Sequence, residues 1–445
     1  MSGIKLSVKI LSLLLIIISA APAGGAEINL KQCLEKALKN NPDIQKQQLD
    51  LNLAHEDINE QKSHNFGRLN LVSSYTHFNL PRTLAPMTPS LITSGPENVP
   101  TTEDLFTAGL IYEVELFTGF TRTRTIEIAD LQQQIAAVSL KLSREQLAYN
   151  VKTLYVKILS LQSLEKAQAA YVESLQHLHQ DIKHQVRLGR KAKIDQLKAA
   201  ADLKSAQAAR MQTRAQVTIM RASLARLMGA DELPDLAAVK PDPEAIVAVE
   251  DDFSSRMEDL QRLQAGHLAV DKSLKLADKA SGALYPQVVF NAGYGQNFGP
   301  SDSTHVDRGE WEHQEIWQAG LNLQWNIFDF GRSRSQIQKA KIAERQSRCE
   351  LQKIKLELKQ ALTEAVTKVN TAVTDYHSAK AEAALTRESA RIEQVRFNQG
   401  ASDINDLLSA KARNLLAESR FIEAAFSYQN ARFYLDYLLE NGENR

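Results

Sequence analysis

The sequence predicts a chain of very long α-helices joined to a few β-strands of the kind found in membrane barrels. No proline follows Pro300, and the remaining segment is rich in Ala, Leu, Gln, Lys and Glu, which is typical of long helices. From Trp317 to Ile327, apolar residues alternate with polar residues or glycine, which is the period of a β-strand. Both patterns occur twice in the chain.

The segment from Trp317 to Phe328 carries the strongest strand signal. Up to Ile327 its odd positions are apolar, and its even positions hold Gln, Asn and one Gly, with no charge. A membrane barrel strand shows this pattern because one face meets lipid, the other meets water, and aromatic residues mark the interfaces. We expect a lipid-facing set of Trp317, Leu321, Leu323 and Trp325, and a lumen-facing set that includes Asn322 and Gln324.

Three further segments predict partner strands, at 69–78, 109–117 and 288–298. Partners are required because a lone strand in lipid would leave its backbone amides without hydrogen bonds. In the second segment, Glu113 and Glu115 lie on the face opposite the apolar residues. We place these two carboxylates on the lumen face and interpret them first as part of a solvated polar surface; tuning of ion passage is the alternative role.

Composition argues against nucleic-acid binding and catalysis. Lys plus Arg and Asp plus Glu both number 53, so no net field would attract nucleic acid. Cys33 and Cys349 show no metal-site spacing, and His177 and His184 share a helix face but stand too far apart to bind one ion. No nucleophile elbow, phosphate-binding loop or HExxH motif is present. We therefore expect no enzyme activity, no cofactor and no metal.

Residues 1–26 are predicted to be a signal peptide. Two lysines precede an apolar core at Leu11–Ile18 that is too short to span a membrane, and cleavage is expected after Ala23 or Ala26. An uncleaved anchor helix is the alternative. No cysteine follows either cleavage site, so no lipid anchor is expected, and no later segment reaches the ~18 apolar residues of a spanning helix.

Two very long helices follow the strands. The first runs from Thr121 to about Val186, with apolar residues at alternating steps of four and three that form a coiled-coil seam. At 1.5 Å per residue, its length is about 100 Å. The second runs from Arg332 to about Arg396, and shorter helices return after Gly189 and Gly400.

The chain is an internal duplication. Phe117 matches Phe328, and Gly189 matches Gly400, at one offset of 211 residues. A constant offset means that the long helices have equal length, as helices lying side by side require. We predict a first repeat at 27–228, an acidic, proline-containing linker and equatorial region at 229–256, and a second repeat at 257–445.

Short motifs in a fixed order identify the family that this chain resembles. They are Asn41-Pro42-Asp43 in the opening helix, Ser281–Tyr294 at a helix-to-strand junction, Asn326–Gly331 at a strand-to-helix turn, and Arg396–Gly400 with Asp406-Leu407-Leu408 at a hairpin tip. Together they resemble the TolC family of outer-membrane efflux and secretion channels, over essentially the whole mature chain. The first half departs where Gly67 replaces the Pro286 of the second half.

The resemblance implies a homotrimer in the outer membrane. Each subunit would give four strands to a 12-stranded transmembrane β-barrel, and the helices would form an α-helical barrel extending into the periplasm. Elementary physics agrees, since four strands alone leave two edges in lipid. The implied function is a passive conduit of a tripartite efflux or type I secretion system. Its partners would be a periplasmic adaptor (membrane fusion) protein, an inner-membrane pump of RND or ABC type, and outer-membrane lipid.

The resemblance also assigns roles to the two hairpin tips. Asp403 and Asp406 would line the periplasmic aperture, although a helix N-cap is the alternative for Asp403. The family's latch positions hold Phe397 and Ser402, so that latch does not carry over. We expect adaptor docking on tip residues Arg187, Leu188, Gly189, Arg190, Lys191, Phe397, Gly400 and Ser402.

Two other functions stay open at this point. A periplasmic coiled-coil scaffold that never inserts is one, and the alternating strand argues against it. Export of proteins rather than drugs is the other, and the sequence does not separate the two. Loops 79–105 and 299–315 are expected outside the cell, with Gly189 and Gly400 at the far periplasmic end.

Overall fold

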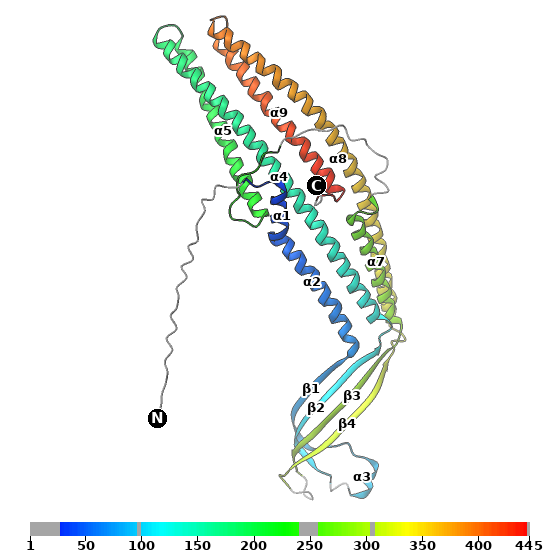
Figure 1. Ribbon diagram of the computed structural model, residues 1–445. Helices are drawn as coiled ribbons and strands as arrows, with labels where there is room; N and C mark the ends of the chain where they lie inside the picture. The colour runs from blue at the N-terminus through cyan, green and yellow to red at the C-terminus, as the bar shows by residue number, and fades with distance from the viewer. Residues whose placement is uncertain (1–26, 96–98, 240–256, 303–307, 443–445) are drawn as a thin grey trace, which may run out of the picture. The chain divides into compact units, whose positions relative to one another are not determined.

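The computed structural model describes residues 27–95, 99–239, 257–302 and 308–442 (Figure 1). The predicted signal peptide and most of the predicted linker lie outside these residues, so the domain boundaries stay predictions. The elements are α1 (Leu30–Asn40), α2 (Pro42–Ser63), η1 (His64–Phe66), β1 (Arg68–Thr83), α3 (Pro89–Ser94), β2 (Thr101–Phe117), α4 (Thr121–Arg187), α5 (Lys193–Leu227), α7 (Gln261–Ser281), η3 (Gly282–Leu284), β3 (Gln287–Pro300), β4 (Trp311–Gln324), α8 (Arg332–Asn398) and α9 (Ile404–Leu438).

The chain forms two compact units, and each long helix contributes to both. The first unit contains α5, most of α9 and the segments of α4 and α8 that lead into the hairpin tips. The second contains the sheet, α2, α7 and the segments of α4 and α8 that follow the strands. The first unit comprises Met1–Ala37, Val151–Asp242 and Leu385–Phe426, and the second Leu38–Asn150, Pro243–Ala384 and Ser427–Arg445.

The second unit holds one antiparallel sheet with the strand order β1-β2-β3-β4. Each strand pairs with its neighbour in sequence, and Figure 1 shows the strands running together from the helices to the loops. The fold class predicted from the sequence, long helices with four strands, is confirmed. The strands are longer than predicted at the loop end, where β1 extends to Thr83 and β2 begins at Thr101.

One strand is shorter than predicted at the helix end. β4 ends at Gln324, so Trp325 lies outside the strand on which the sequence placed it. Gln324 pairs with Gln287, the first residue of β3. Pro286 precedes Gln287 and has no backbone N–H, so it cannot continue the hydrogen bonds between the two strands. Trp325 instead donates its indole N–H to the carbonyl of Leu284 at 3.1 Å.

The two halves of the helical region have matching lengths. α4 and α8 each contain 67 residues, and α5 and α9 each contain 35. Each long helix ends at a glycine in the left-handed region, with φ of 72° at Gly189 and 74° at Gly400. At the first tip, Gly189 and Arg190 donate backbone hydrogen bonds back into the last turn, and the second tip repeats both bonds. This glycine-dependent ending turns each helix back into a hairpin.

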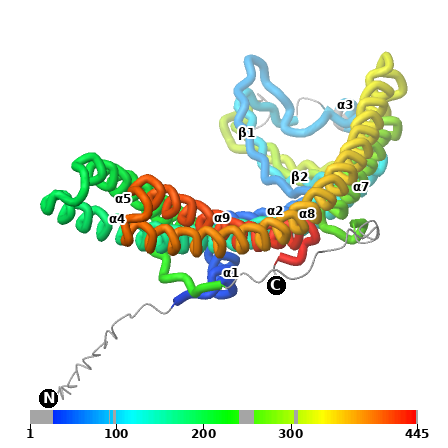
Figure 2. Tube along the Cα trace, turned by 90° about the horizontal axis from the view of Figure 1, so that it is seen from above, coloured from blue at the N-terminus to red at the C-terminus, as the bar shows by residue number. Residues whose placement is uncertain are grey.

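Two seams of buried apolar residues hold the helices together. In the first unit, Leu175 and Ile182 of α4 pack with Leu203 of α5 and with Leu407 of α9. Figure 2 shows the α4–α5 and α8–α9 hairpins lying side by side in this unit. In the second unit, the seam of α8 packs against α7 and α9 through Leu358, Leu362, Val366, Val369 and Val373. The alternating steps of three and four give narrow stripes that suit lateral packing.

No described helix has both the length and the sustained apolarity that a membrane-crossing helix needs.

The seam of α8 predicts a contrast between two leucines on one helix. Leu362 is 2% exposed and Leu356 is 61% exposed. Leu362→Ala should lower the free energy of unfolding by roughly 2–5 kcal/mol, because it leaves a cavity in the core. Leu356→Ala should change it by about 0.5 kcal/mol. Denaturant unfolding followed by circular dichroism measures both, and equal losses would contradict the assigned seam.

Candidate functional site

The sheet has one strongly apolar face. Paired residues on neighbouring strands project to the same side, so the ladder gathers the apolar positions of all four strands. One register row joins Leu71, Leu110, Tyr294 and Trp317. Trp317, Leu321 and Leu323 are 73%, 68% and 64% exposed. The apolar face consists of Leu69, Leu71, Leu110, Tyr112, Val114, Phe290, Tyr294, Trp317, Leu321 and Leu323.

An aromatic cluster lies beyond this apolar face, toward the loops. Tyr75, Phe106, Phe298 and Trp311 come from the four strands, with neighbouring ring centroids 4.8–6.0 Å apart. Sequence reasoning weighed only the tryptophans at each end of one strand and missed this row. The apolar face is therefore bounded by aromatic residues at its loop end, as at one interface of a lipid-facing wall.

The opposite face of the sheet is polar. Predicted lumen residues Glu113, Asn322 and Gln324 all lie on it, and Glu113 pairs in register with Asn291. Glycines take many of the remaining positions on this face, including Gly293 and Gly320 in rows with polar partners. Val72, Ile111, Val289 and Ile316 also lie on this face, but its amides, carboxylates and glycines favour water over lipid.

The two predicted lumen carboxylates are both engaged in ion pairs. Glu113 accepts from the guanidinium of Arg68 at 3.2 Å, and Glu115 accepts from the guanidinium of Arg122. Sequence reasoning missed both arginines, because neither position lies next to its partner along the chain. The pairing with arginine weakens the alternative role, in which these two carboxylates act as free charges on passing ions.

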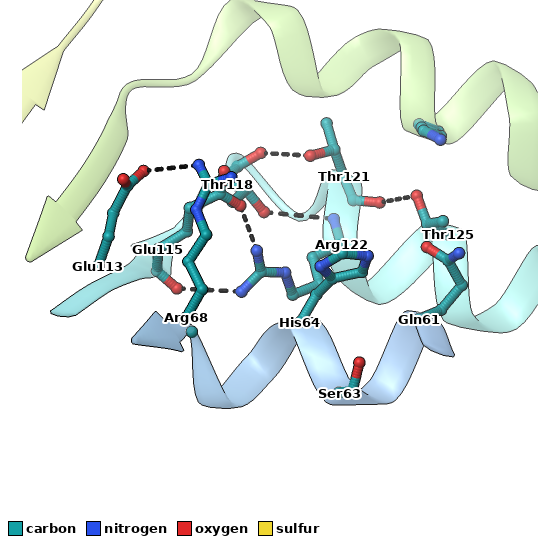
Figure 3. Close-up of a pocket in the computed structure, with 12 residues that line it drawn as sticks. Gln61, Ser63, His64, Arg68, Glu113, Glu115, Thr118, Thr121, Arg122 and Thr125 are labelled. Carbon is teal, nitrogen blue, oxygen red and sulfur yellow. Dashed lines mark hydrogen bonds and ion pairs between the residues drawn. The ribbon is translucent and has the colours of Figure 1, made fainter. Parts of the chain in front are cut away.

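These ion pairs lie in a cavity of about 680 Å³ where the strands meet the helices (Figure 3). We call it the junction pocket. Its walls come from α2, η1, β1, β2, α4 and α7, and all belong to the second unit. It is lined by Gln61, Ser63, His64, Gly67, Arg68, Glu113, Glu115, Thr118, Thr121, Arg122, Thr125 and Lys279.

Near the tips, two lysines of the first hairpin contact uncharged side chains of the second hairpin in the same chain. The ammonium group of Lys191 lies 4.4 Å from the ring centroid of Phe397, which is within the range of a cation–π interaction. Lys198 donates to the side-chain carbonyl of Asn405 at 3.0 Å. Phe397, one of the two positions where the family latch does not carry over, thus holds the first tip by a different interaction.

A third polar contact joins the hairpins further along the helices. The ammonium group of Lys411 on α9 donates to the hydroxyl of Ser174 on α4 at 2.5 Å. Burial lowers the pKa of the Lys411 ammonium, because desolvation disfavours the charged form. The hairpins are therefore joined by polar bonds as well as by the apolar seam.

Asp403 caps α9, which was the alternative role considered for it. Its carboxylate accepts the backbone N–H of Asp406 at 2.9 Å. This hydrogen bond holds the pKa of the Asp403 carboxyl below its ordinary value. Within the described part of one chain, no ion pair joins Asp403 or Asp406 to the basic residues of the first tip. The remaining predicted tip residues lie in or beside the two glycine turns.

No group of three or more His, Cys, Asp or Glu side chains within the described ranges is arranged to hold a metal ion.

Comparison with known proteins gives one family model and several solved structures. The model "Outer membrane efflux protein" matches residues 33–230 and 258–440. A membrane protein from Pseudomonas aeruginosa is 17% identical, with coverage of 94% of this chain and 91% of that chain and a TM-score of 0.79. The CmeC outer membrane channel of Campylobacter jejuni is 17% identical, with coverage of 93% and 86% and a TM-score of 0.78.

A third solved structure has the same fold, the MtrE outer membrane channel of Neisseria gonorrhoeae in its open state. It is 16% identical, with coverage of 94% of this chain and 90% of that chain and a TM-score of 0.74. A search of curated protein sequences gives no match.

The cap at Asp403 leads to a test by hydrogen exchange. Asp403→Ala should speed exchange of the Asp406 amide, because it removes the acceptor of that N–H. The cap should be complete above the ordinary carboxyl pKa and weaken as pH falls through the lowered pKa. Asp406→Ala, which keeps the backbone N–H, should leave the exchange slow. Equal exchange in Asp403→Ala and the parent protein would contradict the cap.

Proposed function

The chain belongs to the outer membrane efflux protein family, and on that premise we propose that three copies assemble into one conduit. The family consists of transport proteins rather than enzymes, so the protein is an outer-membrane efflux channel of tripartite efflux systems that extends into the periplasm. The resemblance drawn from the sequence is thereby confirmed. Family membership also favours a channel over the periplasmic scaffold.

The two-faced sheet with two open edges carries the trimer proposal. Within the described residues, β1 and β4 each pair with a single strand, so each leaves one edge unbonded. In lipid, those edge amides must find partners. Three copies joined edge to edge give a closed 12-stranded barrel, an even number as such barrels generally have. The exposed apolar face would then contact outer-membrane lipid, and the polar face would line the pore.

The helices support a second, α-helical barrel below the strands. Each narrow seam buries one stripe of a long helix and leaves large apolar residues exposed elsewhere on the same chain. Among the exposed residues are Ile342, Leu385 and Ile392 of α8. Lateral packing against neighbouring copies would cover part of this surface.

The hairpin tips are the proposed docking surface for a periplasmic adaptor protein. Leu188 is exposed at the first tip and is flanked by Arg187, Arg190 and Lys191. An exposed apolar side chain surrounded by cations suits a partner that carries an apolar contact and acidic residues. The conduit is passive, so an inner-membrane pump of RND or ABC type would supply the energy for export.

The assigned lipid face predicts position-dependent effects of arginine on β4. Leu321→Arg or Leu323→Arg should cost roughly 2–4 kcal/mol of barrel stability, because each places a cation near the bilayer midplane. Asn322→Arg lies between them on the polar face and should be far milder. The yield of heat-resistant trimers on gels reports the effect. Equal assembly of all three variants would show that the faces have been assigned wrongly.

The three Asp406 side chains of a trimer lead to a prediction about ion selectivity. Around the threefold axis they would form an acidic ring at the periplasmic aperture, which favours cations. Asp406→Asn should lower cation selectivity and sensitivity to block by multivalent cations. Asp406→Glu, which keeps the charge, should retain both. Single-channel recordings in planar bilayers measure these properties, and unchanged selectivity in Asp406→Asn would place the constriction elsewhere.

A further inference from the structure

The junction pocket has walls from several separate elements and opens beside the polar face of the sheet. Arg68 begins β1, Glu113 and Glu115 lie in the last five residues of β2, and Arg122 is the second residue of α4. Lys279 enters from the last turn of α7. Figure 3 shows the labelled arginine and glutamate side chains converging at this junction. Segments distant in sequence thus bring five charged groups together.

The charges in the pocket do not cancel. Arg68 neutralises Glu113, and Arg122 neutralises Glu115. Lys279 takes part in no ion pair with any residue that the structure describes, so its ammonium is a surplus positive charge. Lys279 therefore gives the acidic and basic side chains of the lining, His64 aside, a net charge of about +1.

Two cationic side chains of the pocket, Lys279 and Arg68, keep hydrogen-bond donors that no other described side chain occupies. The Arg68 side chain is 70% exposed, and the nitrogen NH2 is the one that contacts Glu113, so its other N–H groups face the cavity or solvent. The threonine hydroxyls are engaged locally, since Thr121 donates to the carbonyl of Thr118 and Thr125 to that of Thr121. Gln61 and His64 also offer side-chain N–H groups to the pocket, but among the open donors only Lys279 and Arg68 carry a fixed positive charge.

The start of α4 is not itself the anion site. The backbone N–H of Arg122 donates to the hydroxyl of Thr118 at 3.2 Å, so the first turn is capped from within the chain. The Arg122 guanidinium is also held by both the carboxylate and the backbone carbonyl of Glu115. Attraction for a ligand must therefore come from the side chains of β1 and α7.

We propose that the junction pocket binds an organic oxyanion, a carboxylate or a phosphate monoester, between Lys279 and Arg68. Charge-assisted hydrogen bonds from an ammonium and a guanidinium suit this chemistry. A cavity of about 680 Å³ is far larger than an inorganic ion needs and lies in the range of sites for small organic molecules. The placement of this pocket on the pore wall rests on the proposed function, because the barrel puts the polar face inside.

Glycerol 2-phosphate is a suitable probe, with citrate as the carboxylate competitor. Binding to the purified full-length protein in detergent is measured at low salt from the phosphorus NMR linewidth of the probe. Lys279→Gln should weaken binding about tenfold, because it removes one charge-assisted bond. Lys272→Gln, on the same helix but outside the pocket lining, should leave the affinity unchanged. Displacement by citrate would show a site for oxyanions in general, and no displacement a site for phosphate esters.

A second variant should act in the opposite direction. Glu113→Gln removes a competing carboxylate and frees the Arg68 guanidinium, so it should tighten probe binding several-fold. A protein that has only lost its fold cannot bind more tightly, so opposite shifts in Glu113→Gln and Lys279→Gln would support the site. Absence of line broadening in the parent protein, or equal effects of Lys272→Gln and Lys279→Gln, would overturn it.

Channel recordings separate this proposal from the one on which it rests. Channels of normal conductance that the probe blocks, with weaker block in Lys279→Gln, support both. Normal channels from a protein that does not bind the probe overturn the pocket alone. A third outcome is a protein that forms no channels but binds the probe, with weaker binding in Lys279→Gln. That outcome would support the oxyanion site and contradict the conduit.

Discussion

The need to satisfy every backbone amide of the sheet in an apolar surrounding constrains the rest of the molecule. Four strands carry an exposed apolar face, and that face is stable in contact with lipid. In lipid, the free edges of β1 and β4 have no water to bond, so the ladder must close on further strands. On the proposed function, the single chain is one part of a larger barrel, and the helices follow the symmetry that closure imposes.

The sequence predicted the features that depend on periodicity and spacing. Alternation over β4 separated an apolar from a polar side, and the pairing of Trp317 with Tyr294 and of Leu321 with Phe290 extends that division across β3. A constant offset of 211 residues predicted helices of equal length, which α4 and α8 have. Alternation is a local pattern, and the offset is a constant distance along the sequence. Both can therefore be recognised without knowing which segments are in contact.

Features that depend on contacts between distant segments could not be predicted in this way. Arg68, the partner of Glu113, comes from the start of β1, and only the register of β1 against β2 brings the two together. Arg122 follows Glu115 by seven residues, and the turn from β2 into α4 brings this second pair together. The aromatic cluster needs the same register, although its rings were visible in the sequence. At the second tip, the sequence allowed two roles for Asp403, an aperture residue or a helix N-cap. In the single chain its carboxylate accepts the backbone N–H of Asp406, which is the hydrogen bond of an N-cap.

Spin labels at successive positions of β4 test the central claim most directly. After replacement of Cys33 and Cys349 by serine, one label is attached at each position from Trp317 to Gln324 of the protein in lipid bilayers. The account predicts a period of two: labels at odd positions should be relaxed by oxygen dissolved in lipid, and those at even positions by a water-soluble nickel complex. Uniform access of the nickel complex along the strand would contradict a lipid-facing barrel wall.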